Sequence, residues 1–268
     1  MRIVDAHVHL WDVEAFAVPW FRADLGLPRA ATARALRRAT SAVRAAWVDA
    51  AIAVQVAETP EEARWLTELV RHDPRVTRAV LQYEPAEDPT TRPLGTTAMP
   101  EEMFSGIRAA VPQFAADLSN VPGLDALAAA LGERGGVLEL LIRPEQLTGA
   151  AALAARHPDT DLVLCHLGLG YREPDDAWRA GLTVFAAHPR THAKFSGLLS
   201  PARTDAELAA IAADAVAAFG AERLMFGSDW PMSARVHAYP QVVRMVHRAM
   251  SDAAGAAFWA GTADRLYR

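Results

Sequence analysis

Short apolar runs alternate with amphipathic stretches along almost the whole chain. The apolar runs are of strand length and are bounded by turn residues. They predict eight β-strands, over residues 2–9, 50–56, 76–83, 104–108, 137–142, 161–166, 191–196 and 223–228.

The stretches between these runs are rich in alanine and repeat their apolar residues at helical spacing, as Leu208, Ile211, Ala215 and Phe219 do. They predict helices over residues 32–46, 60–71, 123–133, 145–156, 174–187, 203–219, 240–251 and 255–266. Strands that alternate with helices predict parallel strands joined by crossovers, a fold of class α/β. A length of 268 residues fits one domain, residues 1–268, of the α/β-barrel type.

Composition narrows the classes of partner. The net charge of −5 and the lack of a basic stripe argue against a nucleic-acid partner. No apolar run approaches the ~18 residues of a membrane span. Cys165 is the single cysteine, so an internal disulfide is excluded, which fits a reducing cytoplasm. We therefore expect a cytoplasmic protein with a small-molecule substrate. We leave a homodimer open, since the outer helices could carry an apolar patch.

The first predicted strand carries two histidines at its carboxyl end, His7 and His9. Side chains alternate between the two faces of a strand, so Asp5, His7 and His9 should line one face with Ile3. The other face is apolar and consists of Val4, Ala6, Val8 and Leu10. Two imidazoles two residues apart can share one metal ion or one substrate oxygen.

Active sites of α/β barrels lie at the carboxyl ends of the strands. Polar residues fall there in most of the predicted strands. They are His7, His9, Gln55, Gln82, Tyr83, Glu84, Arg108, Arg143, His166, Lys194, Ser196 and Asp229. Two irregular segments, residues 10–30 and 84–103, follow the first and third strands and would cover a pocket at this end.

Five motifs in this order resemble the amidohydrolase superfamily, in its amidohydrolase-2 branch, and within it the sugar-lactonase and 2-pyrone-4,6-dicarboxylate lactonase group. The motifs are Asp5-Ala6-His7-Val8-His9-Leu10-Trp11, Gly106-Ile107-Arg108, His166-Leu167-Gly168, Lys194-Phe195-Ser196-Gly197-Leu198 and Gly227-Ser228-Asp229-Trp230-Pro231. The resemblance covers the whole chain. It departs from the group at Thr262, where asparagine is usual.

The resemblance implies a distorted TIM (β/α)8 barrel with His7, His9, His166 and Asp229 around the reacting centre. Many relatives hold a divalent metal ion there, whereas members of the lactonase branch can work without one. Two-metal relatives also need a carboxylated lysine on strand four and a histidine on strand five. Here strand four ends in Arg108, and strand five has no histidine. We expect at most one ion, zinc above all, on His7, His9 and Asp229.

Each candidate residue receives an expected role. Asp229 is the general base, and His166 stabilises the oxyanion together with the other two histidines. Arg108 and Gln55 bind polar groups of the substrate, while Trp11, Tyr83 and Trp230 form apolar walls. Purely structural roles also remain open for some of these residues. Asp229 could be a turn residue, and Lys194 could pair with Glu139 and Asp5 inside the barrel. Cys165 should face the helices and serve packing.

The sequence thus predicts a hydrolase that opens a cyclic ester, either a sugar-acid lactone or a pyrone dicarboxylate. A metal-dependent decarboxylase of an aromatic or enol acid is the nearest alternative on this scaffold. An amide or acyl hydrolase and a non-catalytic binding barrel are the further alternatives.

Overall fold

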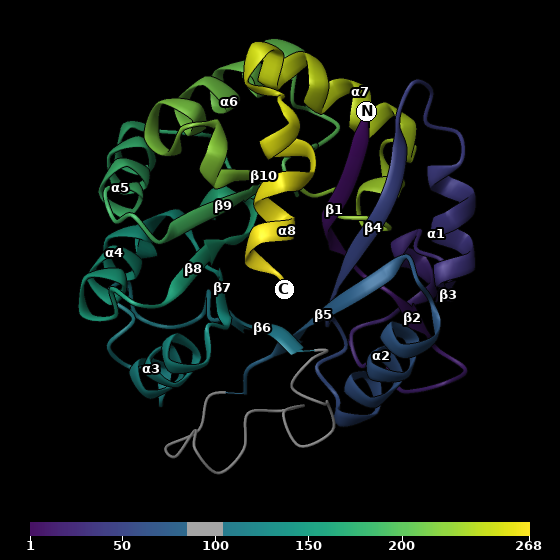
Figure 1. The fold of residues 1–268 in the computed structure, drawn as a ribbon, viewed down its shortest axis with the longest axis horizontal. Helices are drawn as coiled ribbons and strands as arrows, with labels where there is room; N and C mark the ends of the chain where they lie inside the picture. Colours follow the sequence, from purple (N-terminus) through teal and green to yellow (C-terminus); the bar gives the residue numbers. More distant parts are fainter. Residues whose placement is uncertain (85–103) are drawn as a thin grey trace.

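Eight parallel strands form one sheet that curves into a nearly closed barrel in the computed structural model, which describes residues 1–84 and 104–268 (Figure 1). The order in the sheet follows the chain: β1 (Arg2–Val8), β4 (Trp47–Val54), β5 (Val76–Gln82), β6 (Phe104–Ala110), β7 (Val137–Leu141), β8 (Asp161–Leu164), β9 (Thr191–Phe195) and β10 (Leu224–Phe226). The predicted α/β barrel is therefore confirmed. The predicted loop 84–103 lies, after Glu84, outside the described residues.

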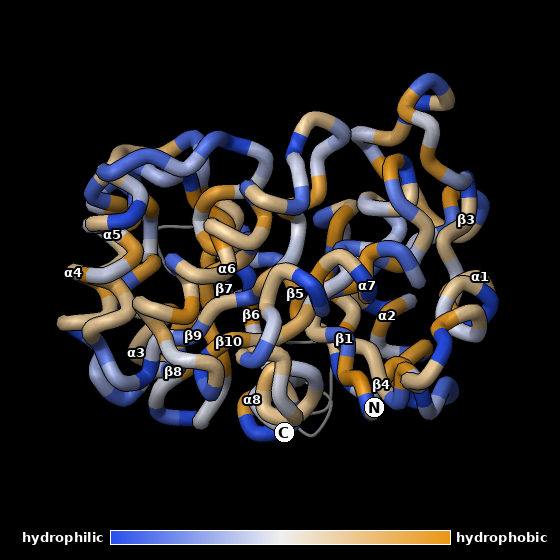
Figure 2. The backbone as a smooth tube through the Cα atoms, turned by 90° about the horizontal axis from the view of Figure 1, so that it is seen from above, coloured by the Kyte–Doolittle hydropathy of each residue, from blue (hydrophilic) through white to orange (hydrophobic). Residues whose placement is uncertain are grey.

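Helices surround the barrel on its outer side (Figure 1). They are α1 (Ala33–Thr40), α2 (Pro60–His72), α3 (Leu124–Arg134), α4 (Leu147–Arg156), α5 (Asp176–Ala186), α6 (Asp205–Phe219) and α7 (Tyr239–Met250). A small hairpin of β2 (Trp11–Asp12) and β3 (Ala30–Ala31) follows the first strand. Hydrophilic residues gather in the peripheral loops, while the central strands are mostly hydrophobic (Figure 2).

Local sequence signals set several helix boundaries. The Thr59 hydroxyl accepts a hydrogen bond from the Glu62 amide, and Pro60 occupies the first turn of α2. Thr204 and Glu207 form a reciprocal capping box at the start of α6. The expected helix 32–46 was too long. It ends at Thr40 because β4 begins at Trp47 to pair with the start of β1.

The carboxyl-terminal segment closes one end of the barrel. Its short helix α8 (Thr262–Leu266) lies across the barrel centre in Figure 1. Arg2, at the start of β1, bonds to Asp264, so this segment covers the amino ends of the strands. It packs against the residues that point into the barrel: Val4, Ala6, Ala50, Ile52, Val54, Val80, Val137, Val163 and Met225.

A β-bulge changes the faces of the first strand. The register between β1 and β4 shifts between Asp5 and Val8. Before the bulge, Val4 and Ala6 point into the barrel, and Asp5 bonds outward to the hydroxyl of Tyr239 on α7. The expectation that Asp5 shares a face with His7 and His9 is therefore wrong, because strict alternation does not survive the extra residue.

The barrel closes between its first and last strands at the carboxyl end. A single bridge links Val8 to Trp230, the amide of His9 donates to Trp230 (2.7 Å), and the amide of Asp229 donates to the carbonyl of His7 (2.9 Å). This joint brings the two ends of the sequence to one edge of the barrel. Within the described residues, no helix is long and apolar enough to cross a membrane.

Candidate active site

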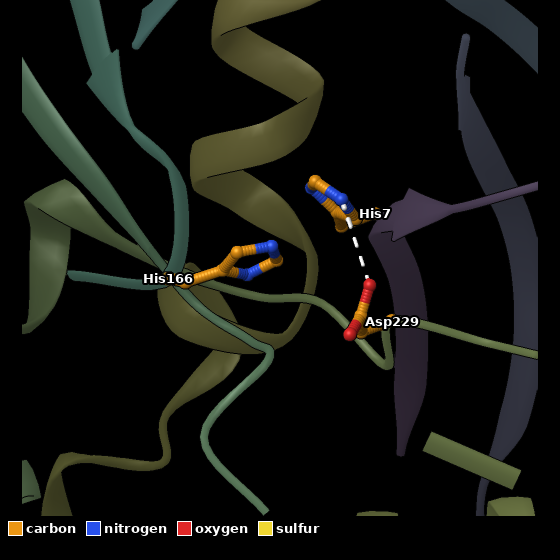
Figure 3. A group of neighbouring side chains, drawn as sticks. All are labelled: His7, His166 and Asp229. Carbon is orange, nitrogen blue, oxygen red and sulfur yellow. Dashed lines mark ion pairs between the residues drawn. The ribbon is translucent and has the colours of Figure 1, made fainter. Parts of the chain in front are cut away.

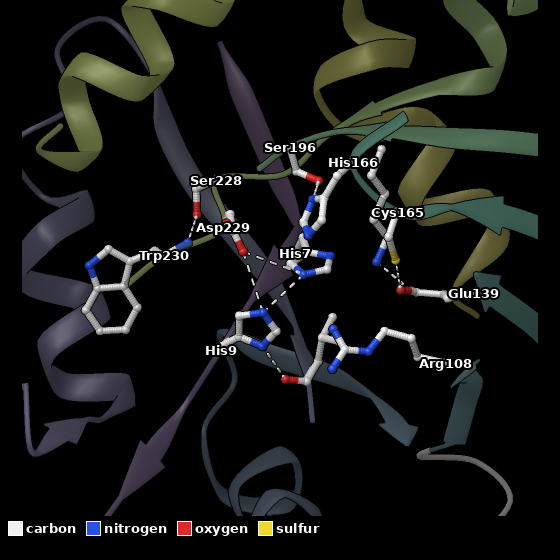
Figure 4. Close-up of polar contacts among 12 residues, drawn as sticks. His7, His9, Arg108, Glu139, Cys165, His166, Ser196, Ser228, Asp229 and Trp230 are labelled. Atoms are coloured by element: carbon white, nitrogen blue, oxygen red, sulfur yellow. Dashed lines mark hydrogen bonds and ion pairs between the residues drawn. The ribbon is translucent and has the colours of Figure 1, made fainter. Parts of the chain in front are cut away.

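His7 and His9 face one another at the mouth of the barrel, with their Nε2 atoms 3.2 Å apart (Figure 4). His7 is fully buried and His9 nearly so. Nδ1 of His9 lies 2.7 Å from the carbonyl oxygen of Val54. A carbonyl only accepts, so Nδ1 carries the proton and Nε2 of His9 presents a lone pair to the site.

Asp229 completes this group from the turn after β10. Its Oδ1 lies 3.5 Å from Nε2 of His9 and 3.8 Å from Nε2 of His7. Asp229 adopts a left-handed backbone conformation, with φ of 56°. Gly227 lies two residues before Asp229. A Cβ atom on Gly227 would stand only 2.8 Å from Cβ of His7. A glycine is therefore needed for the turn to approach β1 so closely.

A buried carboxylate holds this turn to β1. Oδ1 of Asp5 accepts hydrogen bonds from the amides of His7 (3.1 Å) and Ser228 (2.8 Å), and Oδ2 accepts from the Tyr239 hydroxyl (2.8 Å). Burial raises the pKa of Asp5 to about 6, although these bonds favour the charged form. Asp5 therefore fastens the histidine strand to the Asp229 turn. From the sequence, Asp5 was expected beside Lys194 inside the barrel.

His166 enters the site from the opposite wall. β8 ends at Leu164, and His166 and Leu167 then adopt left-handed conformations with φ of 54° and 55°. This turn points the imidazole toward His7 and Asp229, and the ring centroids of His166 and His7 lie 4.7 Å apart (Figure 3). One potential ligand atom each from His7, His166 and Asp229 lie within 4.8 Å of one another.

Two residues after β9 fix the His166 ring. Ser196 Oγ lies 2.9 Å from Nδ1 of His166. Gly197 lies against the same ring, and a Cβ atom there would stand 2.4 Å from Nδ1. Both residues belong to the motif Lys194-Phe195-Ser196-Gly197-Leu198, which by itself indicates no role for them. The signal was the position of the Ser-Gly pair directly after the seventh strand.

The expectation that Cys165 faces the helices is wrong. Its thiol lies inside the barrel, with Sγ 3.2 Å from Oε2 of Glu139. Cys165 follows the end of β8 and points to the same side as Val163, as strand alternation requires, and the left-handed turn at His166 brings the next side chain to that side as well.

Two imidazoles of this site, those of His7 and His166, are biased toward their neutral form. Burial lowers the pKa of His7 well below its ordinary value, and the nearby Lys194 ammonium lowers it further. Burial also lowers the pKa of His166, against the opposing attraction of Asp229. Both rings should therefore be uncharged at pH 7, when they can coordinate a cation or exchange a proton.

The geometry of His7, His9 and Asp229 fits one divalent ion. A tetrahedral zinc ion bound at about 2.1 Å from each ligand needs ligand atoms about 3.4 Å apart. The three donor atoms here are separated by 3.2, 3.5 and 3.8 Å. The Val54 carbonyl orients His9 from behind, as outer partners of metal-binding histidines do.

Arg108 lies beside this group on β6 but is largely engaged. Its Nε donates to Oε1 of Gln82 (3.2 Å), and one terminal nitrogen donates to the carbonyl of Gln55 (2.6 Å). The Gln55 side chain donates to the carbonyl of Thr59 and accepts from the amide of Gln82. Gln55 thus holds neighbouring strand ends together, and the remaining Arg108 nitrogen is the group left for a ligand.

The three predicted aromatic walls differ in their surroundings. Trp11 is fully buried in the hydrophobic core, and its indole donates to the carbonyl of Pro28. Tyr83 is also buried, and its hydroxyl donates to the carbonyl of Pro122. Trp230 directly follows Asp229, and its carbonyl accepts a hydrogen bond from the amide of His9. Its indole belongs to the hydrophobic core and lies on the side of the Asp229 turn away from His7 and His9 (Figure 4).

Comparisons with known proteins agree with this geometry. The family model described as amidohydrolase matches residues 4–268. An L-fucono-1,5-lactonase from Burkholderia multivorans is 32% identical over 98% of this chain and 95% of that protein.

Solved structures give the same result. The crystal structure of an amidohydrolase from Burkholderia multivorans with bound zinc matches with a TM-score of 0.83 and 30% identity, over 100% of this chain and 99% of that one. A putative 2-pyrone-4,6-dicarboxylic acid hydrolase from Pseudomonas putida matches with a TM-score of 0.75 over 99% and 97% of the two chains, but at 20% identity it shares the fold alone. The family predicted from the motifs is confirmed: the chain belongs to the amidohydrolase family.

Proposed function

We propose that this protein is a lactonase that hydrolyses the cyclic ester of a sugar acid. The observation that carries the proposal is the meeting of His7, His9, His166 and Asp229 at the carboxyl end of the barrel. The relative named L-fucono-1,5-lactonase favours a sugar-acid lactone over a pyrone dicarboxylate, because the pyrone hydrolase is similar in fold only.

Asp229 is the proposed general base. A lactone is opened when a water molecule loses a proton and attacks the ring carbonyl carbon, and a carboxylate at hydrogen-bond distance can accept that proton. The same carboxyl group can then return the proton to the ring oxygen as the carbon–oxygen bond breaks. The left-handed turn at Asp229 holds the carboxylate toward His7 and His9, where the reacting carbonyl would lie.

The histidines are the proposed stabilisers of the tetrahedral intermediate, His166 directly and His7 and His9 through the cation that their Nε2 lone pairs would hold. The intermediate carries negative charge on the former carbonyl oxygen, and preorganised groups around that oxygen lower the barrier. His166 supplies Nε2, since Ser196 engages its Nδ1. Arg108 is the proposed contact for a hydroxyl or carboxylate of the substrate, with Gln55 holding it in place. Trp11, Tyr83 and Trp230 would support the site from the hydrophobic core.

His7, His9 and Asp229 are the residues that would hold a zinc ion. A bound ion would polarise the carbonyl and lower the pKa of a bound water molecule. The fit of the three donor atoms to tetrahedral spacing supports this assignment.

We also propose that the protein is located in the cytoplasm, with which its single cysteine is compatible. A homodimer is a further proposal, and light scattering would recognise it by its mass in solution.

Substrate screening with a pH indicator tests the proposed function. The purified protein should release protons from aldonolactones and should release no carbon dioxide. Asp229→Asn should keep the melting temperature within a few degrees and lower kcat by about 1,000-fold, since it removes the base. Parallel assays with chelator and with added zinc measure the contribution of the ion. Release of carbon dioxide from an aromatic acid would support the decarboxylase instead, and near-normal turnover by Asp229→Asn would refute the base assignment.

Titration of the imidazoles by NMR tests the charge state on which this mechanism depends. In metal-free protein, the His166 and His7 signals should titrate below the ordinary value of about 6.5, because burial disfavours their cations. The rings should therefore stay neutral while the pH falls from 8 through the ordinary value. His166→Gln identifies the His166 signal, and the urea-unfolded chain gives the reference. A His166 midpoint at or above the reference would contradict the prediction.

A pair of glycine substitutions tests the placement of the His166 ring. Gly197→Ala forces a Cβ atom into the ring, so it should displace the imidazole and lower kcat by about 100-fold. Gly170→Ala is the matched control. Gly170 has nearly the same φ (58° against 59°) but has nothing within 4 Å of the added atom, so it should lose stability without losing turnover. Equal turnover in the two variants would show that the ring position does not matter.

A further inference from the structure

A polar cluster lies inside the barrel beneath His7 and has no role in the mechanism above. It consists of Glu139 on β7, Lys194 on β9, Cys165 after β8 and Tyr267 from the chain end. Glu139, Lys194 and Cys165 are fully buried, and Tyr267 nearly so. Lys194 is the single lysine of the chain. The predicted pairing of Lys194 with Glu139 is thus found, without Asp5.

The carboxylate of Glu139 is held by three donors. Oε1 accepts from Nζ of Lys194 (2.5 Å) and from the Tyr267 hydroxyl (2.6 Å), while Oε2 accepts from the Cys165 thiol (3.2 Å). A carboxylate offers about four acceptor positions. The described residues therefore leave one position on Oε2 for a further donor.

His7 lies beside this cluster and offers a potential hydrogen-bond donor, its Nδ1 atom. Its Nδ1 is buried and has no hydrogen-bond partner among the described residues. A ring nitrogen of His7, a Glu139 oxygen and the Cys165 sulfur all lie within 4.8 Å of one another. Figure 4 places His7 between Asp229 and His9 on one side and Glu139 and Cys165 on the other.

We propose that Glu139 is a positioning residue for His7. Its carboxylate favours the proton on Nδ1 of His7, so that Nε2 keeps its lone pair toward His9 and Asp229. Nδ1 of His7 makes no hydrogen bond to Glu139 among the described residues, so the carboxylate acts on it electrostatically. The inference rests on the proposed role of His7 at the reacting centre.

This preference makes the two facing Nε2 atoms, 3.2 Å apart, a site for a cation, because two lone pairs at that distance repel each other unless a cation lies between them. His9 already holds its proton on Nδ1, against the Val54 carbonyl, so its Nε2 is a lone pair. With the His7 proton also on the far nitrogen, two lone pairs and the Asp229 carboxylate converge on one point. Such a point suits a cation or an electron-poor carbonyl carbon and repels anions.

The cluster is not a second metal site, although His7, Glu139 and Cys165 have ligand-type atoms close together. Lys194 places its ammonium 2.5 Å from the same carboxylate and takes the place of a cation. Tyr267 adds its hydroxyl and its ring, whose centroid lies 5.2 Å from Nζ. The penultimate residue of the chain therefore helps to orient Glu139.

The decisive variant removes the carboxylate without leaving a charge unpaired. Glu139→Gln/Lys194→Met keeps the volume of both side chains and removes both buried charges, so it should fold. We expect kcat on an aldonolactone to fall 10- to 100-fold with KM changed less than about threefold. Zinc alone, titrated against a competing fluorescent chelator, should bind 10- to 100-fold more weakly.

Two single variants complete the test. Tyr267→Phe keeps the ring and removes one donor to Glu139, so kcat should fall about fivefold. Ser105→Ala is the control, because Ser105 bonds the carbonyl of Arg268 at the same chain end without touching Glu139, and it should stay within twofold.

The outcomes separate the inference from the proposed function. If the wild type hydrolyses lactones and the folded double variant matches it in kcat and zinc affinity, the positioning role is overturned. If the wild type hydrolyses no lactone, the proposed function fails, and zinc affinity alone decides whether Glu139 acts on His7. If the double variant does not fold, Tyr267→Phe decides: a loss of kcat against an unchanged Ser105→Ala supports the role, and equal values overturn it.

Discussion

The joint between the first strand and the turn after the last strand is the constraint on which the site depends. Two backbone hydrogen bonds connect His9 to Trp230 and Asp229 to His7, and the buried Asp5 carboxylate connects the amides of His7 and Ser228. The two segments are more than 200 residues apart in the chain. Among the described residues, one isolated bridge, from Val8 to Trp230 in the turn after β10, joins the two segments as a sheet, so these few bonds decide where the histidines stand relative to Asp229.

The barrel interior is arranged in layers that change from apolar to polar along its axis. The carboxyl-terminal helix and the inward-pointing valines that pack against it form the apolar floor. Above the floor lies the Glu139–Lys194 pair, and above that pair lie the histidines and Asp229. Buried charges need partners, and the pair meets this need with opposite charge, a phenol and a thiol. The dry floor also strengthens every electrostatic interaction in the layer above it.

The sequence predicts the strands, the barrel and the four residues at its mouth, because hydrophobic periodicity and strand-end position are properties of short segments. It fails where one residue changes the local geometry. The bulge in β1 puts the histidines on the face opposite to Asp5, and the left-handed turn at His166 brings the imidazole to the same side as Cys165. The pattern of apolar residues along the chain indicates neither the bulge nor the left-handed turn. The engagement of Gln55 and Arg108 by backbone groups could not be predicted either, since it depends on contacts between strands that are distant in sequence.

A crystal structure of the Asp229→Asn variant with an unreacted aldonolactone would show whether the lactone ring binds where the histidines and position 229 meet. The lactone carbonyl carbon should lie within about 4 Å of the side chain at position 229, close enough for one water molecule between them. The carbonyl oxygen should point toward the imidazole of His166. A lactone bound elsewhere on the barrel, or bound at the mouth with its carbonyl turned away from His166, would show that these residues do not form the reacting centre.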